Sequence, residues 1–469
     1  MKWLSSLLPG KRNSMSPRES EVLENMRRDW DRPLISDRGS ARHFHGREGI
    51  RRNFARMLAG AKESSQGGTT FLIQGAPGAG KTALLHQLGK DAGDNWAVVR
   101  IKPMALESPV VMAQALGKVY IESRKKVLKS SAKIVGVDLN TTLSGTQTVT
   151  GVLQDCIGDE DSVILVLDEA QHLATPSSHA AGISIRDTLD AITNGQTGRK
   201  VVLVLAGLGH TWEALKDRGL SRLRRGCSHI VGRFRHKETA RRVVKDWLSE
   251  YGCDPDHMGA WIEALVRASD DWPQHVICCV AAALDHFDSQ GDQPTIAAVR
   301  AVLDAAREEK HVFYAARSAG IGTDDVALLG IIVGACGPDS VYDRMHLLSL
   351  LSVREREESA RTVLGVMVAN GVLATRTMRP KGKVHAYYVP IPSMERYLIG
   401  QAIDFAARQP NVCQELYGEI RDVILSRRGV IKGRMEDLLD GHFTHMGTGE
   451  EGPHGSQKGF EQGGQGIER

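Results

Sequence analysis

The 469-residue chain contains seven cysteines, and no two of them form a Cys-x-x-Cys pair. That absence argues against both a disulfide framework and a zinc site, and it favours a reducing, cytoplasmic setting. No apolar run approaches the roughly eighteen residues of a membrane span. The opening apolar stretch is cut at Pro9-Gly10, which makes it a poor signal peptide, so we expect no membrane partner.

A strong net charge is also missing. The formal charge of +4 is too small to identify a nucleic-acid-binding protein, so any basic surface must be local. The apolar content of 41% and charged content of 25% are ordinary for a globular protein. The length predicts more than one domain.

One stretch carries a specific signal. The apolar run Phe71–Gln74 reads as a buried strand, and a helix with regularly spaced leucines follows Lys81-Thr82. Between them, Gly75, four residues and Gly80-Lys81-Thr82 complete the phosphate-binding loop pattern. The predicted nucleotide-binding residues of this loop are Gly75, Ala76, Pro77, Gly78, Ala79, Gly80, Lys81, Thr82 and Ala83.

The residue types of this loop suit a polyphosphate. Glycines let successive backbone N–H groups turn toward an anion, and the start of the helix adds partial positive charge. Lys81 can reach the β- and γ-phosphates, and the Thr82 hydroxyl can ligate Mg²⁺. The alternative is a glycine-rich turn with a chance lysine, but the strand before it and the helix after it favour the phosphate loop.

An acidic pair follows a second buried strand. Ser162–Leu167 is apolar and β-branched, and Asp168-Glu169 comes where that strand emerges from the sheet. We expect Asp168 to hold Mg²⁺ and Glu169 to orient and deprotonate the water that attacks the γ-phosphate. The alternative is an acidic helix start after a core strand, without catalytic content.

Three further positions are candidates by their place in the chain. Gly46-Arg47 lies upstream of the phosphate loop, where it could wall an adenine pocket, although Glu48 also suits an ordinary helix start. His210 follows the buried strand 201–207 and could sense the γ-phosphate, whereas Thr211 is better explained as a helix N-cap. Arg222 precedes a short strand at 228–231, where it could reach a neighbouring subunit's γ-phosphate; a solvated basic turn or nucleic-acid contacts are equally open.

In this order the motifs resemble those of AAA+ ATPases, most of all the origin-initiator branch and related bacterial transposition-helper and secretion-associated ATPases. The resemblance covers roughly residues 43–310. It implies an α/β fold, in which a five-stranded parallel P-loop sheet is sandwiched by helices and followed by a helical lid. It also implies ATP with Mg²⁺ and a homo-oligomer in which Arg222 completes a neighbour's site.

The sequence departs from the family in the lid. Such lids often carry an arginine that touches the nucleotide, and here Gln274 or His275 stands at that place. Either can hydrogen-bond a phosphate, but neither is a permanent guanidinium. Slow, partner-stimulated hydrolysis is therefore expected.

Residues 320–398 resemble a winged helix. Helices are expected near 327–332, at 340–351 and at 357–369, and strands at 372–378 and 384–389 make a hairpin with a basic tip. Phosphate contacts with DNA are expected from Arg376, Arg379, Lys381 and Lys383. The third helix is mostly apolar, with Arg361 its only base-reaching side chain, so docking of a protein remains an alternative.

These readings predict the following domains: an arm at 1–42, an AAA+ core at 43–234, a lid at 235–318, a winged-helix-like domain at 319–398, helices at 399–446 and a disordered tail at 447–469. No role can be assigned to 131–150. The leading hypothesis is an ATP-dependent switch acting on DNA, as an initiator, a loader or a selector of transposition targets. The alternative is a regulatory or defence-system ATPase whose winged helix docks a protein effector. A helicase is disfavoured because no second nucleotidase-like half is present.

Overall fold

The computed structural model describes residues 43–63, 69–93, 96–101, 162–174, 200–217, 227–254, 256–337, 340–353, 357–378, 384–426 and 430–432. The predicted arm, the 131–150 segment, Arg222, the hairpin tip and the tail lie outside these residues. The chain forms two compact units. The first holds the described residues up to Gly322 together with Val363–Arg376 and Val389–Tyr397. The second holds the rest.

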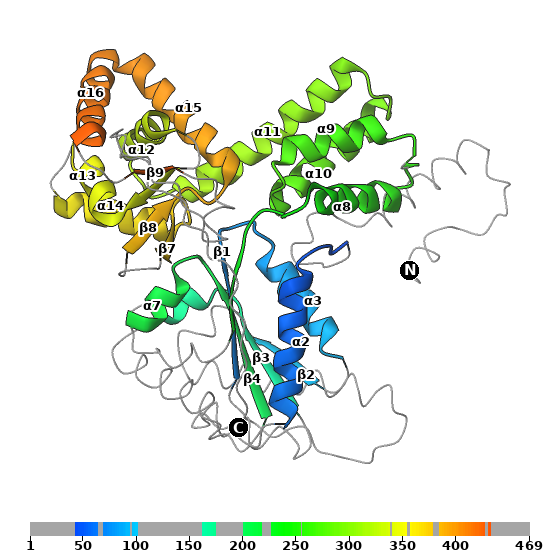
Figure 1. Ribbon diagram of the computed structural model, residues 1–469. Helices are drawn as coiled ribbons and strands as arrows, with labels where there is room; N and C mark the ends of the chain where they lie inside the picture. Colours follow the sequence, from blue (N-terminus) through cyan, green and yellow to red (C-terminus); the bar gives the residue numbers. More distant parts are fainter. Residues whose placement is uncertain are drawn as a thin grey trace, which may run out of the picture. The chain divides into compact units, whose positions relative to one another are not determined.

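A five-stranded sheet forms the centre of the first unit (Figure 1). Its order is β2-β3-β4-β1-β5, and each neighbouring pair is parallel. The strands are β1 (Thr69–Gly75), β2 (Trp96–Ile101), β3 (Ser162–Leu167), β4 (Lys200–Gly207) and β5 (Cys227–Val231). This confirms the predicted five-stranded α/β fold class.

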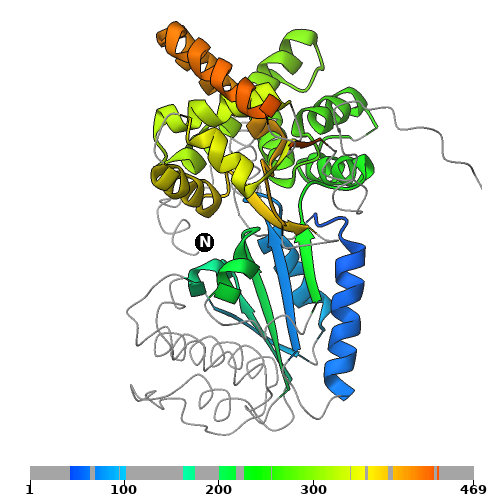
Figure 2. The same cartoon turned by 60° about the vertical axis from the view of Figure 1, so that its left-hand side comes forward.

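The strands are parallel and central because their sequences are apolar on both faces. Every residue of β3 is buried, as is every residue of β4 after Lys200. Such a sheet needs cover on each side. Figures 1 and 2 show α2 (Glu48–Glu63) and α7 (Thr211–Asp217) on opposite sides of it. Helix α3 (Lys81–Asp91) packs on β1 and β4.

The sheet order determines where the candidate residues meet. Strand β4 lies between β3 and β1, and all three run in the same direction. Their carboxyl ends therefore open at one edge, which is where open α/β sheets bind ligands. The phosphate loop, the acidic pair and the loop after β4 all leave the sheet at that edge.

A helical bundle follows β5 within the same unit. It consists of α8 (Lys237–Glu250), α9 (Gly259–Ser269), α10 (Pro273–Gln290) and α11 (Ile296–Ser318). Trp261 is fully buried in the shared core, where it packs with Leu265 and Val276. The indole Nε1–H of Trp261 donates to Asp292 O at 2.7 Å. The burial of large side chains on several helices makes this bundle a core of its own.

The C-terminal part carries helices and a small sheet. The helices are α12 (Thr323–Cys336), α13 (Arg344–Leu351), α14 (Glu357–Ala369), α15 (Pro392–Arg408) and α16 (Pro410–Ser426). The strands β6 (Ser340–Asp343), β7 (Ala374–Met378), β8 (Val384–Tyr388) and β9 (Val430–Lys432) form a sheet in the order β7-β8-β6-β9.

Two sequence expectations were wrong in this part. Residues 340–343 are a strand rather than the start of a helix, because Asp343 caps α13 and its carboxylate accepts the His346 N–H at 2.9 Å. Residues 430–432 are likewise a strand, paired antiparallel with β6, rather than helix.

Among the described residues, no single helix is long and apolar enough to cross a membrane. The consecutive helices α11 and α12 meet that criterion of length and composition only when they are taken together.

Candidate functional site

The phosphate loop leaves β1 through two positions that strongly favour glycine. A Cβ on Gly75 would lie 2.4 Å from Val231 O on the neighbouring strand β5. Gly80, the N-cap of α3, has φ +84°, a left-handed conformation that costs other residues energy. The loop therefore turns tightly into the N-terminus of a helix, where unpaired backbone N–H groups and the helix dipole favour an anion.

Lys81 is the first residue of α3, and its side chain is buried. Its Nζ donates to Gly75 O at 3.0 Å and to Ala76 O at 3.1 Å. Burial lowers the pKa of this ammonium, and the nearby carboxylates of Glu169 and Asp168 oppose that shift. The loop thus holds a desolvated cation at its centre, and such a cation gains most from a negatively charged ligand.

Thr82 and Asp168 face each other across the sheet edge. The Thr82 hydroxyl donates to Asp168 Oδ2 at 2.9 Å, and Asp168 Oδ1 accepts the Glu169 N–H at 3.0 Å. A hydroxyl and a carboxylate are the oxygen ligands that Mg²⁺ takes beside a polyphosphate. No cluster of three or more His, Cys, Asp or Glu that could hold a metal occurs among the described residues. Mg²⁺ with a phosphate ligand needs no such cluster.

Glu169 has an unusual backbone and a defined partner. Its φ of +52° is left-handed for a residue with a Cβ, a strain that clusters at functional sites. Gln171 Nε2 donates to Glu169 Oε2 at 2.5 Å, and Gln171 Oε1 accepts the Leu208 N–H at 3.1 Å. Sequence reasoning missed Gln171, although it lies within the polar run that follows β3.

The loop after β4 differs from expectation at Thr211. Thr211 is the first residue of α7, fully buried, and its hydroxyl makes no hydrogen bond within the described part of the chain. The expected capping bond is therefore absent there, and the prediction of a side-chain cap was wrong. His210 beside it is partly buried, and this burial lowers the pKa of its imidazole. Its contact with a phosphate remains a prediction.

The Arg47 side chain hydrogen-bonds to the backbone of the segment after β5. Its guanidinium donates to Gly232 O and, at 3.2 Å, to Arg233 O, and it lies 5.5 Å from the centre of the Phe234 ring. Burial, together with the charge of Arg235, lowers the pKa of Arg47 to about 10, so it stays protonated at neutral pH. Arg47 thereby ties residues 43–47 to the segment after β5, and a side-chain contact with a nucleotide would have to break these bonds.

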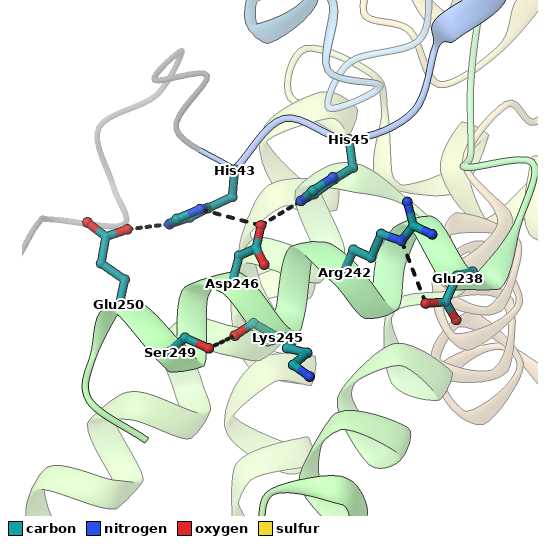
Figure 3. A network of polar contacts seen from close by, with 8 residues as sticks. All are labelled: His43, His45, Glu238, Arg242, Lys245, Asp246, Ser249 and Glu250. Carbon is teal, nitrogen blue, oxygen red and sulfur yellow. Dashed lines mark hydrogen bonds and ion pairs between the residues drawn. The ribbon is translucent and has the colours of Figure 1, made fainter. Parts of the chain in front are cut away.

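Two histidines fasten residues 43–47 to helix α8, as Figure 3 shows. His45 Nε2 lies 2.6 Å from Asp246 Oδ2, and His43 pairs with both Asp246 and Glu250. The His43 ring meets Trp247 edge-on at 4.8 Å. The sequence analysis did not single out these histidines, although their His-x-His spacing would place both on one side of an extended segment.

Gly46 lies in this fastened segment. Its φ is +82°, and an added Cβ would lie 3.0 Å from Thr239 Cγ2 of α8. The segment before α2 therefore runs close to the first helix of the bundle. Gly46 and Arg47 stay candidates to line an adenine pocket with their backbone atoms, since the Arg47 side chain is bonded to the segment after β5.

The start of α10 touches the phosphate loop through its backbone. Gln274 N donates to Gly78 O at 3.1 Å, and a Cβ on Gly78 would lie 2.8 Å from Gln274 Cβ. The Gln274 side chain points along its own helix, with Nε2 3.9 Å from Cys278 Sγ. The hydrogen bond to the loop is thus made by the Gln274 backbone, and a contact of its side chain with a phosphate stays a prediction.

His275 lies in the interior, contrary to expectation. Its side chain is fully buried, with Nε2 3.0 Å from Tyr314 Oη and Nδ1 3.1 Å from Ser393 Oγ. Burial, with a smaller contribution from Lys310, lowers the pKa of His275 to about 3. Both ring nitrogens are engaged, so no nitrogen remains for a phosphate in this arrangement. The prediction of His275 as a nucleotide ligand is corrected accordingly.

The DNA contacts expected of the basic hairpin stay predictions. Arg376 lies in β7 but its side chain is outside the described ones, as are Arg379, Lys381 and Lys383. Arg361, the base-reaching candidate on α14, pairs with Glu357 at 2.6 Å.

Comparison with known protein families finds a match over part of this chain. Residues 64–215 match the model of a family described as an AAA domain. No curated protein matches the chain. Among solved structures, the ORC2 protein of Aeropyrum pernix is 12% identical, with a TM-score of 0.47, 82% of this chain covered and 96% of that one.

Two further structures are similar at the same level. A Walker-type ATPase of Pyrococcus abyssi is 17% identical, with a TM-score of 0.48 and coverage of 75% of this chain and 97% of that one. The ORC1 protein of A. pernix in complex with DNA is 19% identical, with a TM-score of 0.40 and coverage of 78% and 94%.

Proposed function

We propose that this chain, whose residues 64–215 match an AAA domain, is an ATP-binding and ATP-hydrolysing switch of the AAA+ class. The observation that supports this best is the hydrogen bond between Thr82 and Asp168, beside the buried ammonium of Lys81. A cation, a metal-ligating hydroxyl and a carboxylate converge on one sheet edge, as hydrolysis of a nucleoside triphosphate requires.

Each residue has a definite task in this proposal. The backbone N–H groups of the loop and Lys81 bind the phosphates, while Thr82 and Asp168 hold Mg²⁺. An ion held there would supply positive charge to offset that of the phosphates. Glu169 orients a water and accepts its proton as the water oxygen bonds to the γ-phosphorus, and ADP leaves.

Arg222 connects hydrolysis to oligomer assembly in this proposal. We propose that the Arg222 side chain approaches the γ-phosphate bound by an adjacent copy, so that hydrolysis depends on assembly. Its place shortly before β5, at the end of the AAA core, supports this role. A guanidinium suits the task because it stays charged and forks onto phosphate oxygens.

DNA is the proposed partner. The hairpin strands β7 and β8 are joined by a turn whose sequence, Arg379 to Lys383, is basic, which suits backbone phosphates. One observation favours a protein effector instead. Arg361 is paired with Glu357, and the first turn of α14 is acidic, so this helix offers little positive charge to a DNA groove. A protein effector is therefore the second candidate.

The test compares ATP turnover of wild type, Glu169→Gln and Glu63→Gln, each with and without duplex DNA, while light scattering follows assembly. Glu63 is an exposed carboxylate at the end of α2 and serves as the control. We expect Glu169→Gln to bind ATP and lose turnover by about 100-fold or more, as for other acid–base groups. Normal turnover in Glu169→Gln would refute the catalytic assignment. Turnover and assembly both indifferent to DNA would refute DNA as the partner and leave the protein effector.

A further inference from the structure

Gln171 joins two loops of the candidate site with a single amide group. It lies in the short helix Ala170–Ala174 that follows β3. Its Nε2 donates to Glu169 Oε2 at 2.5 Å, and its Oε1 accepts the Leu208 N–H at 3.1 Å. Leu208 is the residue after β4, the strand between β3 and β1. The amide therefore connects the acidic pair to the neighbouring strand's end.

The backbone around Glu169 needs such a partner. The left-handed φ of +52° is unfavourable for a glutamate, so the surrounding structure must hold it. The turn is closed by His172 N, which donates to Glu169 O at 3.0 Å. That bond fixes the backbone only, whereas the Gln171 amide fixes the carboxylate. One carboxylate oxygen is thereby anchored, and the other oxygen remains to accept a proton from a water.

Gly207 makes room for this amide. A Cβ at Gly207 would lie 2.7 Å from Gln171 Oε1 and 2.2 Å from Thr211 Oγ1. Contacts under 3 Å force something to move, and the buried Thr211 cannot swing into solvent. The glycine at the end of β4 is thus matched to the glutamine after β3, although the two residues belong to different loops.

We propose that Gln171 is a positioning residue, which holds the Glu169 carboxylate for proton transfer and ties its orientation to the end of β4. The inference rests on the proposed function, because it matters only if Glu169 is the base. It predicts that hydrolysis responds to changes at Leu208 and Gly207, although neither residue has a side chain that could do acid–base chemistry.

Two substitutions separate the two ends of the amide. Gln171→Glu keeps an acceptor for Leu208 N–H but removes the donor to Glu169 and adds a like charge. Gln171→Met has similar length and removes both interactions. His172→Ala, on the exposed neighbour in the same short helix, is the matched control. Gly207→Ala tests the same contact from the other strand.

We expect kcat for ATP to fall by about 10–100-fold in Gln171→Glu, Gln171→Met and Gly207→Ala, as a misplaced catalytic group would predict. The equilibrium affinity for a fluorescent ATP analogue with Mg²⁺ should stay within about twofold of wild type. The rise in melting temperature that Mg-ATP produces should stay within a degree or two of wild type. His172→Ala should match wild type in all three measurements.

A double-mutant cycle decides whether Gln171 acts through Glu169. If it does, Glu169→Gln combined with Gln171→Met turns over no more slowly than Glu169→Gln alone. Further slowing in the double variant, or kcat within twofold of wild type in both Gln171 variants, would overturn the inference. If ATP affinity, kcat and melting temperature all fall together in the Gln171 variants, the inference is also overturned and Gln171 has a structural role. If Glu169→Gln itself hydrolyses normally, it is the proposed function that fails.

Discussion

The Thr82 hydroxyl and the Asp168 carboxylate meet at 2.9 Å, although 86 positions of sequence separate them. The first lies at the start of α3 and the second directly after β3. Only the sheet order, which places β1 and β3 on either side of β4, brings them together. The meeting point has the donor chemistry of a magnesium site, and its occupancy can be tested directly.

Thr82→Ala should weaken binding of the Mg²⁺ complex of ATP on the order of tenfold, because one oxygen ligand and its partner bond are removed. Binding of ATP in excess chelator should change little. Thr82→Ser, which keeps the hydroxyl, is the control and should resemble wild type. Equilibrium titration with and without Mg²⁺ measures the difference, and equal losses in both conditions would contradict a metal-ligating role.

Lys81→Met should lose nucleotide affinity by about 10–100-fold, since a charge-assisted hydrogen bond to phosphate is worth roughly 1.5–3 kcal/mol. Lys90→Met, on the exposed end of the same helix, should bind as wild type does. Titration with ATP and with adenosine separates the two causes of a loss. If adenosine binding falls equally, the helix is disturbed and the phosphate role is not supported.

Gly371→Ala should destabilise the protein by about 1–3 kcal/mol. Its φ is +75°, and the new Cβ would lie 2.6 Å from Pro77 Cδ in the phosphate loop. Gly320→Ala is the control for backbone strain without a steric clash, because Gly320 has φ +81° and no atom lies within 4 Å of the added Cβ. The free energy of unfolding, measured by chemical denaturation, should be lower for Gly371→Ala than for Gly320→Ala. ATP affinity should fall only in Gly371→Ala. Equal behaviour of the two variants would mean that the contact with Pro77 is unimportant.

Acid should destabilise the first unit through His275. Its pKa is about 3 in the folded protein and near 6.5 in the unfolded chain, so between these pH values the unfolded state binds the proton and the folded state does not. This stability is complete above pH 6.5 and is lost as pH falls toward 3, by at most about 1.4 kcal/mol per pH unit. Stability measured at pH 7.5 and 5.5 should fall less in His275→Asn than in wild type or in the exposed-site control His172→Ala. Identical losses would contradict the assignment.

Most of the sheet could be predicted because its strands are continuous apolar runs bounded by glycine or acidic residues. Ser162–Leu167 and 201–207 needed no tertiary information, since their short length and β-branched residues favour a strand buried on both faces over a buried helix. Strand β9 escaped prediction because three residues, Val430–Lys432, give no readable period. Its existence depends on pairing with β6, which comes from far earlier in the chain.

The candidate site was less predictable, because a sequence motif does not specify the direction in which each side chain points. Gln274 and His275 are neighbours in sequence, yet one meets the phosphate loop through its backbone and the other lies in the core. Successive residues of a helix point about 100° apart, so one of the two must turn away from any given neighbour. His43 and His45 were missed for a different reason, since their partners on α8 are distant in sequence. Gln171 was missed because its second partner, the Leu208 N–H, lies after another strand.

The first unit is assembled from pieces of chain that are not consecutive. It is complete only when Val363–Arg376 and Val389–Tyr397 join the residues before Gly322. Tyr397 is made 75 residues after Gly322, which at about 5–20 residues per second is roughly 4–15 s later on the ribosome. Until then Pro77 lacks Gly371 and His275 lacks Ser393. The nascent protein therefore cannot complete the first unit before Tyr397 has been synthesised, and a fragment ending at Gly322 would stay in that unfinished state.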